Sequence, residues 1–83
     1  MSVEIWDSCY TVLVLTKPAG VFMKRSGVVR ADKFENYQVA VQVAELRINE
    51  FPNAGFVLVR SDIQMRVDAE WVNIGDGKWL RRK

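Results

Sequence analysis

The chain has 83 residues, 49% of them hydrophobic, with a formal net charge of +2. This is the size of one small domain, expected over residues 1–83, and the charge is too small to indicate a nucleic-acid partner by itself. The single cysteine leaves no internal disulfide, and the absence of histidine excludes histidine-based catalysis and histidine metal sites. No stretch approaches the roughly 20 apolar residues of a membrane span, and the first residues do not resemble a signal peptide, so we expect a cytoplasmic protein.

The first part of the chain predicts two antiparallel strands. Cys9–Thr16 is rich in β-branched and aromatic residues and carries no charge, which indicates a central strand buried on both faces. Pro18 and Gly20 then predict a turn. Val21–Ala31 is expected to return beside the first strand, with a bulge or tight turn at Ser26-Gly27.

A helix is predicted over Asp32–Phe51. Asp32 and Glu35 have the spacing of a capping box, and Pro52 ends the helix. At 3.6 residues per turn, one apolar stripe is expected to cover the sheet. Its members are Phe34, Tyr37, Ala40, Val41, Ala44, Ile48 and Phe51.

Three further strands are predicted after the helix. The first is Phe56–Arg60, and the second is Ile63–Trp71, whose alternation points Val67, Ala69 and Trp71 in the same direction as Ile63 and Met65. Gly75–Gly77 predicts a hairpin loop, and Lys78–Arg82 the last strand. The fold class is therefore α+β: a single helix packed on an antiparallel sheet of about five strands, in the order β-β-α-β-β-β.

A second apolar side of the helix, nearly opposite the first stripe, carries Val39, Val43 and Leu46. Their spacing of four and three residues places them in contact with one another. We predict that they form a protein interface, either with another protein or in a homodimer. The alternatives are cover by another part of the chain and incidental exposure of single apolar residues.

Basic residues suggest a second surface. The candidates for contacts with nucleic acid or another anionic partner are Lys24, Arg25, Arg30, Lys78, Trp79, Arg81 and Arg82. They would form one basic patch if the second and last strands lay on the same side of the sheet, where phosphates could pair with the cations and a base could stack on Trp79. Core packing is the competing interpretation for Trp79.

Neither the acidic residues nor the cysteine indicates an active site. Asp68 and Glu70 share one side of a strand with Arg66, which favours a charge-balanced surface over acid–base catalysis or cation binding. Cys9 is expected to be an inert thiol. We find no metal-ligand cluster and no nucleotide-binding loop, so we expect no metal, no cofactor and no small-molecule substrate.

Taken together, these features predict a small non-catalytic protein-binding module that regulates or inhibits a partner by occupying its surface. Free-standing domains with a similar element order include phage-borne inhibitors of bacterial defence systems, so a phage-type accessory or anti-defence protein is one expectation. The alternative is a nucleic-acid-binding protein that uses a basic sheet face and the C-terminal tail at low salt.

Overall fold

The computed structural model describes residues 9–16 and 27–83. One helix packs on a five-stranded antiparallel sheet, and the element order β-β-α-β-β-β is the predicted one. The strands lie side by side in the order β2-β1-β3-β4-β5, so β2 and β5 are the edges. The elements are β1 (Tyr10–Leu15), β2 (Val28–Phe34), α1 (Tyr37–Glu50), β3 (Phe56–Ser61), β4 (Arg66–Gly75) and β5 (Lys78–Arg81).

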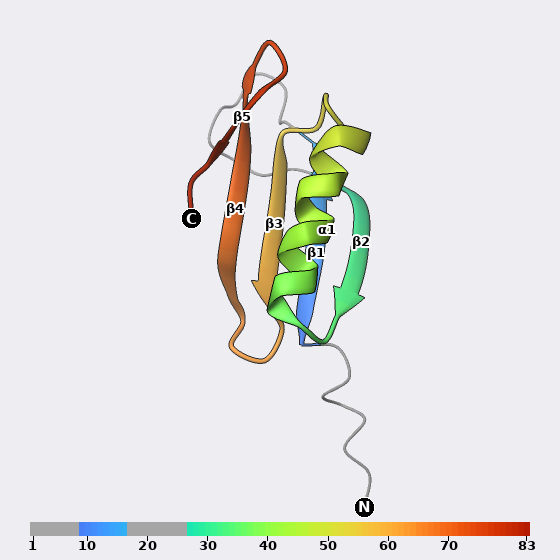
Figure 1. Cartoon of the computed structure of the whole chain (residues 1–83), viewed down its shortest axis with the longest axis vertical. Helices are drawn as coiled ribbons and strands as arrows, with labels where there is room; N and C mark the ends of the chain where they lie inside the picture. The colour runs from blue at the N-terminus through green and yellow to red at the C-terminus, as the bar shows by residue number, and fades with distance from the viewer. Residues whose placement is uncertain (1–8, 17–26) are drawn as a thin grey trace, which may run out of the picture.

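The helix lies along one face of the sheet, in front of β1 and β3 (Figure 1). Strand β2 runs on one side of α1, and β4 and β5 run on the other. This arrangement gives α1 two flanks, one toward each edge of the sheet, and the functional candidates divide between them.

The first strand is central, as predicted. It pairs antiparallel with β2 on one side and with β3 on the other. Val12 and Val14 point toward the helix and are fully buried, whereas Leu13 and Leu15 point to the opposite face. A strand buried on both faces has a continuous run of apolar residues, and for this reason the central position of β1 could be inferred from sequence.

The core beneath the helix confirms the predicted main stripe. Ala40 and Ala44 are fully buried against the sheet, and their small side chains allow α1 to approach it closely. Around them pack Tyr37, Val41, Ile48 and Phe51, all partly buried. Phe34 joins the same cluster from β2. Its predicted place in the helix was therefore wrong, whereas its predicted packing against the core is confirmed.

The predicted start of the helix was also wrong. Asp32 lies in β2 opposite Val12, and the N-cap is Asn36, whose Oδ1 accepts hydrogen bonds from the backbone N–H of Gln38 (2.8 Å) and Val39 (3.2 Å). Asn is as good a cap as Asp, so sequence spacing alone could not choose between them. Asp32 belongs to the strand because it pairs with Val12 of β1, and its side chain forms ion pairs with Arg30 and Arg47.

The second strand as described begins at Val28, and it ends later than predicted. It covers Val28–Phe34, and the predicted turn at Pro18–Gly20 and the part of Val21–Ala31 before Gly27 lie outside the described residues. Its antiparallel pairing with β1 is confirmed. The register shifts between Val14 and Leu15, which pair with Arg30 and Val28, so a bulge lies at Val29, whereas Ser26 is not described.

The predicted alternation of the fourth strand fails at a bulge. Val59 pairs with Ala69 and the next residue, Arg60, pairs with Val67, which leaves one extra residue in β4. Ala69 and Trp71 therefore face the helix, whereas Val67 packs on the other face. That face carries the second apolar cluster, formed by Leu15, Phe56 and Leu58 with Leu13, Val67 and Val72 around them.

Two other features of the predicted strand change with it. Ile63 and Met65 lie in the turn that precedes β4, and their side chains are 52% and 79% exposed. Glu70, expected on a solvated face, is only 5% exposed, and its Oε2 pairs with Nη2 of Arg82 at 3.1 Å.

The last hairpin forms as predicted. Gly75 pairs with Lys78, and the two residues between them, Asp76 and Gly77, both have positive φ angles of 56° and 72°. This is the backbone of the tight turn that Asp-Gly favours between antiparallel strands. Trp79 pairs with Asn73 across the hairpin. Within the described residues, no helix is long and apolar enough to span a bilayer.

Candidate protein interface

Two of the predicted interface residues, Val39 and Val43, lie on the flank of α1 that faces the edge strand β2. Val39, Val43 and Arg47 follow one another at intervals of four residues, so they form one row along the helix. Arg47 reaches Asp32 on β2, which places the whole row on that side. Polar Gln38 and Gln42 lie on the other flank of the helix, where they line a hollow with Arg81.

Exposure differs among the three members of this stripe. Val39 is 43% exposed and Leu46 is 58% exposed, whereas Val43 is half-buried. The structure thus leaves Val39 and Leu46 open to solvent. We call this surface, Val39, Val43 and Leu46, the β2-side stripe.

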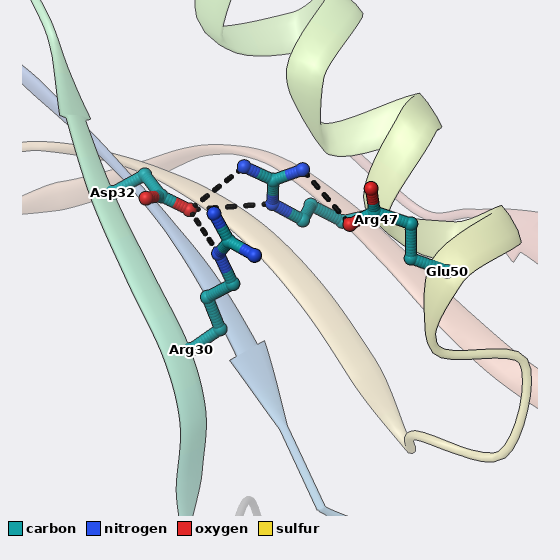
Figure 2. Close-up of polar contacts among 4 residues, drawn as sticks. All are labelled: Arg30, Asp32, Arg47 and Glu50. Carbon is teal, nitrogen blue, oxygen red and sulfur yellow. Dashed lines mark hydrogen bonds and ion pairs between the residues drawn. The ribbon is translucent and has the colours of Figure 1, made fainter.

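A cluster of ion pairs borders the β2-side stripe. The Oδ2 atom of Asp32 accepts hydrogen bonds from Nε of Arg30 (2.9 Å) and from Nε and Nη2 of Arg47 (3.2 and 3.0 Å). Nη1 of Arg47 donates to Oε1 of Glu50 at 2.9 Å. Figure 2 shows Arg47 extending from the helix toward Asp32 and Arg30 on the strand. The four charges balance, so this border is polar without being strongly positive or negative.

The environment of Asp32 favours its charged form. Partial burial raises the pKa of Asp32, but the hydrogen bonds and positive charges of Arg30 and Arg47 outweigh it and hold the pKa below its usual value. The Arg47 side chain is only 12% exposed, so its guanidinium is fixed between helix and strand. The cluster thereby fixes the flank of α1 that carries the stripe.

The opposite flank of α1 faces β5 across a shallow groove. A hollow of about 270 Å³ is lined by Tyr37, Gln38, Val41, Gln42 and Arg81. The Cζ atom of Arg81 lies 4.9 Å from the ring centroid of Trp71, a cation–π distance. Sequence reasoning placed Arg81 among the basic residues but could not pair it with Gln38 and Gln42, since that neighbourhood depends on where α1 lies on the sheet.

The basic residues do not gather in a single patch. Arg30 is on β2 and Lys78 and Arg81 are on β5, at the two opposite edges of the sheet. The second and last strands therefore do not lie on the same side of the sheet, and they do not bring these residues into one basic patch. Arg82 follows β5 and pairs with Glu70, and Trp79 packs half-buried against the core. Lys24 and Arg25 lie outside the described residues.

A second polar cluster was not predicted. Thr11 Oγ1 donates to Oδ2 of Asp62 at 2.6 Å, and Arg60 pairs with Oδ1 of the same carboxylate at 3.0 Å. Partial burial raises the pKa of Asp62, but the hydrogen bonds from Thr11 and Arg60 and the charges of Lys33 and Arg60 hold it below its usual value. Thr11 and Asp62 are far apart in sequence, so no local pattern indicates this contact. Its position at the end of the strands, joining β1 to the turn after β3, indicates a structural role.

No family model, curated protein or solved structure matches this chain. Within residues 9–16 and 27–83, no group of three or more cysteine or acidic side chains is arranged to hold a metal ion. The fold and the surfaces of α1 are therefore the basis for any functional proposal.

Proposed function

We propose that this chain is a non-catalytic protein-binding module that regulates or inhibits a partner by occupying part of its surface. The observation that carries the proposal is the β2-side stripe, in which Val39 and Leu46 are 43% and 58% exposed on a helix whose other apolar side is already buried. Covering the exposed part of each side chain would contribute on the order of 1 kcal/mol.

The surroundings of the stripe also suit a protein partner. An apolar centre bordered by charged groups is the usual composition of a specific interface. Here the border is the Arg30, Asp32, Arg47 and Glu50 cluster, whose side chains are already positioned by their mutual bonds. A partner would therefore meet a largely preformed surface, which reduces the entropy lost on binding.

The proposal extends to the location of the protein and to its biological class. A cytoplasmic location is consistent with the single cysteine, which leaves no internal disulfide. A phage-type anti-defence protein is one candidate within this class, supported only by the element order of the fold. The nucleic-acid alternative has less support, because Arg30 and Arg82 are ion-paired and lie toward opposite edges of the sheet.

The proposal is tested with Leu46→Arg, which places a charge on an exposed position of the stripe, and Ile63→Arg as the matched control. Ile63 is similarly exposed, at 52%, but lies in the turn before β4. The molar mass in solution is measured for the wild type and both variants, and each is used to capture proteins from the native host. We expect self-association or capture of a defined partner that Leu46→Arg abolishes and Ile63→Arg preserves.

Val43→Arg separates an interface from a role in the fold. Because Val43 is half-buried, a folded variant that loses association supports the interface, whereas a variant that unfolds as a monomer places Val43 in the core. A wild-type monomer whose captured proteins are unchanged by Leu46→Arg would refute the proposal. Salt-sensitive binding of mixed-sequence DNA or RNA, lost at higher ionic strength, would favour the alternative instead.

A further inference from the structure

Arg81 differs from every other arginine in the described part of the chain. Each of the other five pairs with an Asp or Glu side chain, whereas Arg81 forms no ion pair with an Asp or Glu of residues 9–16 and 27–83. The paired residues are Arg30 and Arg47 with Asp32, Arg60 with Asp62, Arg66 with Asp68, and Arg82 with Glu70. Within the described residues, Arg81 is thus the arginine with which no Asp or Glu side chain pairs.

The guanidinium of Arg81 is nevertheless held in place. It lies over the ring of Trp71, which is only 5% exposed, and its Nε donates to the main-chain oxygen of Lys83, the last residue of the sequence, at 3.2 Å. No hydrogen bond from Nη1 or Nη2 is formed within the described residues. Stacking and the Nε bond therefore orient the group while leaving its two terminal nitrogens available to a ligand.

The groove beside Arg81 offers further donors. Gln38 and Gln42 are one helical turn apart on the flank of α1 that faces β5, and both line the hollow. Tyr37 lines its end, and its ring is fixed by an edge contact with Tyr10 at a centroid distance of 5.5 Å. Val41 supplies an apolar wall. The lining thus combines one cation, two carboxamides and a phenol, and it contains no carboxylate.

We propose that this groove between α1 and β5 binds a carboxylate side chain from an acidic segment of a protein partner. The planar fork of a guanidinium matches a carboxylate with two parallel hydrogen bonds, and the carboxamides can donate to the same group or to the adjacent backbone. The site lies on the opposite flank of α1 from the β2-side stripe and does not depend on it.

A protein carboxylate suits this groove better than a nucleic-acid backbone. A polyphosphate is held by several cations along its path, whereas a single arginine lines the hollow. Glu45 also follows Val41 by one turn of α1, so a negative charge lies beside the groove. That charge repels a continuous polyanion more than a single carboxylate.

The test is a titration of the isotope-labelled protein with a blocked oligoglutamate peptide at low ionic strength, followed by NMR. The matching oligoglutamine peptide is the control. We expect the side-chain amide signals of Gln38 and Gln42 and the Nε–H signal of Arg81 to shift with oligoglutamate alone. Arg81→Gln should weaken binding by about tenfold or more, which corresponds to the loss of one charged hydrogen-bonding pair.

Two further variants make the result specific. Lys78→Gln removes the same charge from the same strand but from a residue that does not line the groove, so it should weaken binding by less than about threefold. Arg81→Lys keeps the charge and loses the fork, so it should weaken binding nearly as much as Arg81→Gln. Each variant is first shown to be folded by its amide spectrum.

Three results would overturn the proposal. The groove signals could remain unchanged with oligoglutamate, or Lys78→Gln could weaken binding as much as Arg81→Gln, which would indicate unspecific attraction to net charge. A single-stranded oligonucleotide could also shift the groove signals at lower concentration than oligoglutamate, which would assign the groove to nucleic acid.

Discussion

Arg47 on the helix and Asp32 on the edge strand are joined by two hydrogen bonds, from Nε and Nη2 to the same carboxylate oxygen, at 3.2 and 3.0 Å. The two residues are 15 positions apart and come from different elements. Their pairing fixes the side of α1 on which the β2-side stripe lies. Asp32 is a strand residue paired with Val12, whereas its spacing from Glu35 predicted a helix cap.

Removal of Arg47 should reduce stability more than removal of an exposed arginine. The Arg47 side chain is 12% exposed and leaves Asp32 partly uncompensated when it is lost, so Arg47→Met is expected to cost about 1–3 kcal/mol. Arg66→Met is the control, because Arg66 is 63% exposed and its pair with Asp68 should contribute less than about 1 kcal/mol. Urea unfolding measures both, and equal losses would contradict the structural role of the Asp32 cluster.

The stability of the fold should fall on the acid side. The pKa values of Asp32 and Asp62 are lowered in the folded state, so their contribution is present above the pKa of an unfolded carboxyl, about 3.9. It is lost as the pH falls from about 5 through the lower folded pKa values. The free energy of unfolding, measured with urea at a series of pH values from about 5 downward, should show the decline. Asp62→Asn should make this decline shallower. An unchanged slope in that variant would contradict the assigned pKa direction.

Asn36 should be the residue that caps the helix. Its Oδ1 accepts two backbone N–H groups at the start of α1, so Asn36→Ala is expected to cost about 1 kcal/mol, within a range of about 0.5–2. Asn36→Asp retains an acceptor at the same position and should preserve most of the stability. Thermal or urea unfolding distinguishes the two, and an Asn36→Ala variant as stable as the wild type would show that the cap is unimportant.

Gly77 is needed for its backbone angle and not for space. Its φ is +72°, and a Cβ added there would meet nothing within 4 Å, so Gly77→Ala is expected to cost about 1–2 kcal/mol from backbone strain alone. Gly27→Ala is the control, since its added Cβ would lie 3.6 Å from Thr16 Oγ1, an ordinary contact, and its φ is not in the left-handed region. Comparable unfolding free energies for the two variants would argue against this account.

Local patterns predicted the elements well where one physical cause dominated. The uninterrupted apolar run of β1 indicated burial on both faces, and Asp76-Gly77 indicated a tight hairpin. They failed where two residues could serve the same purpose, as at the helix start, where Asn36 and not Asp32 is the cap. They also failed in β4, because one extra residue reverses the side to which Val67 points, and a bulge has no reliable sequence signal.

The sequence by itself determined the α+β class, the order of the elements and the main apolar stripe of the helix, because hydrophobic periodicity records which side of an element is buried. Beyond the two predicted hairpins, only the tertiary structure decided which elements are neighbours. The strand order places Arg30 and Arg81 at opposite edges, and the position of α1 turns Val39 toward β2 and Gln38 toward β5. Periodicity cannot supply this information, since lateral order depends on pairing between residues far apart in the chain.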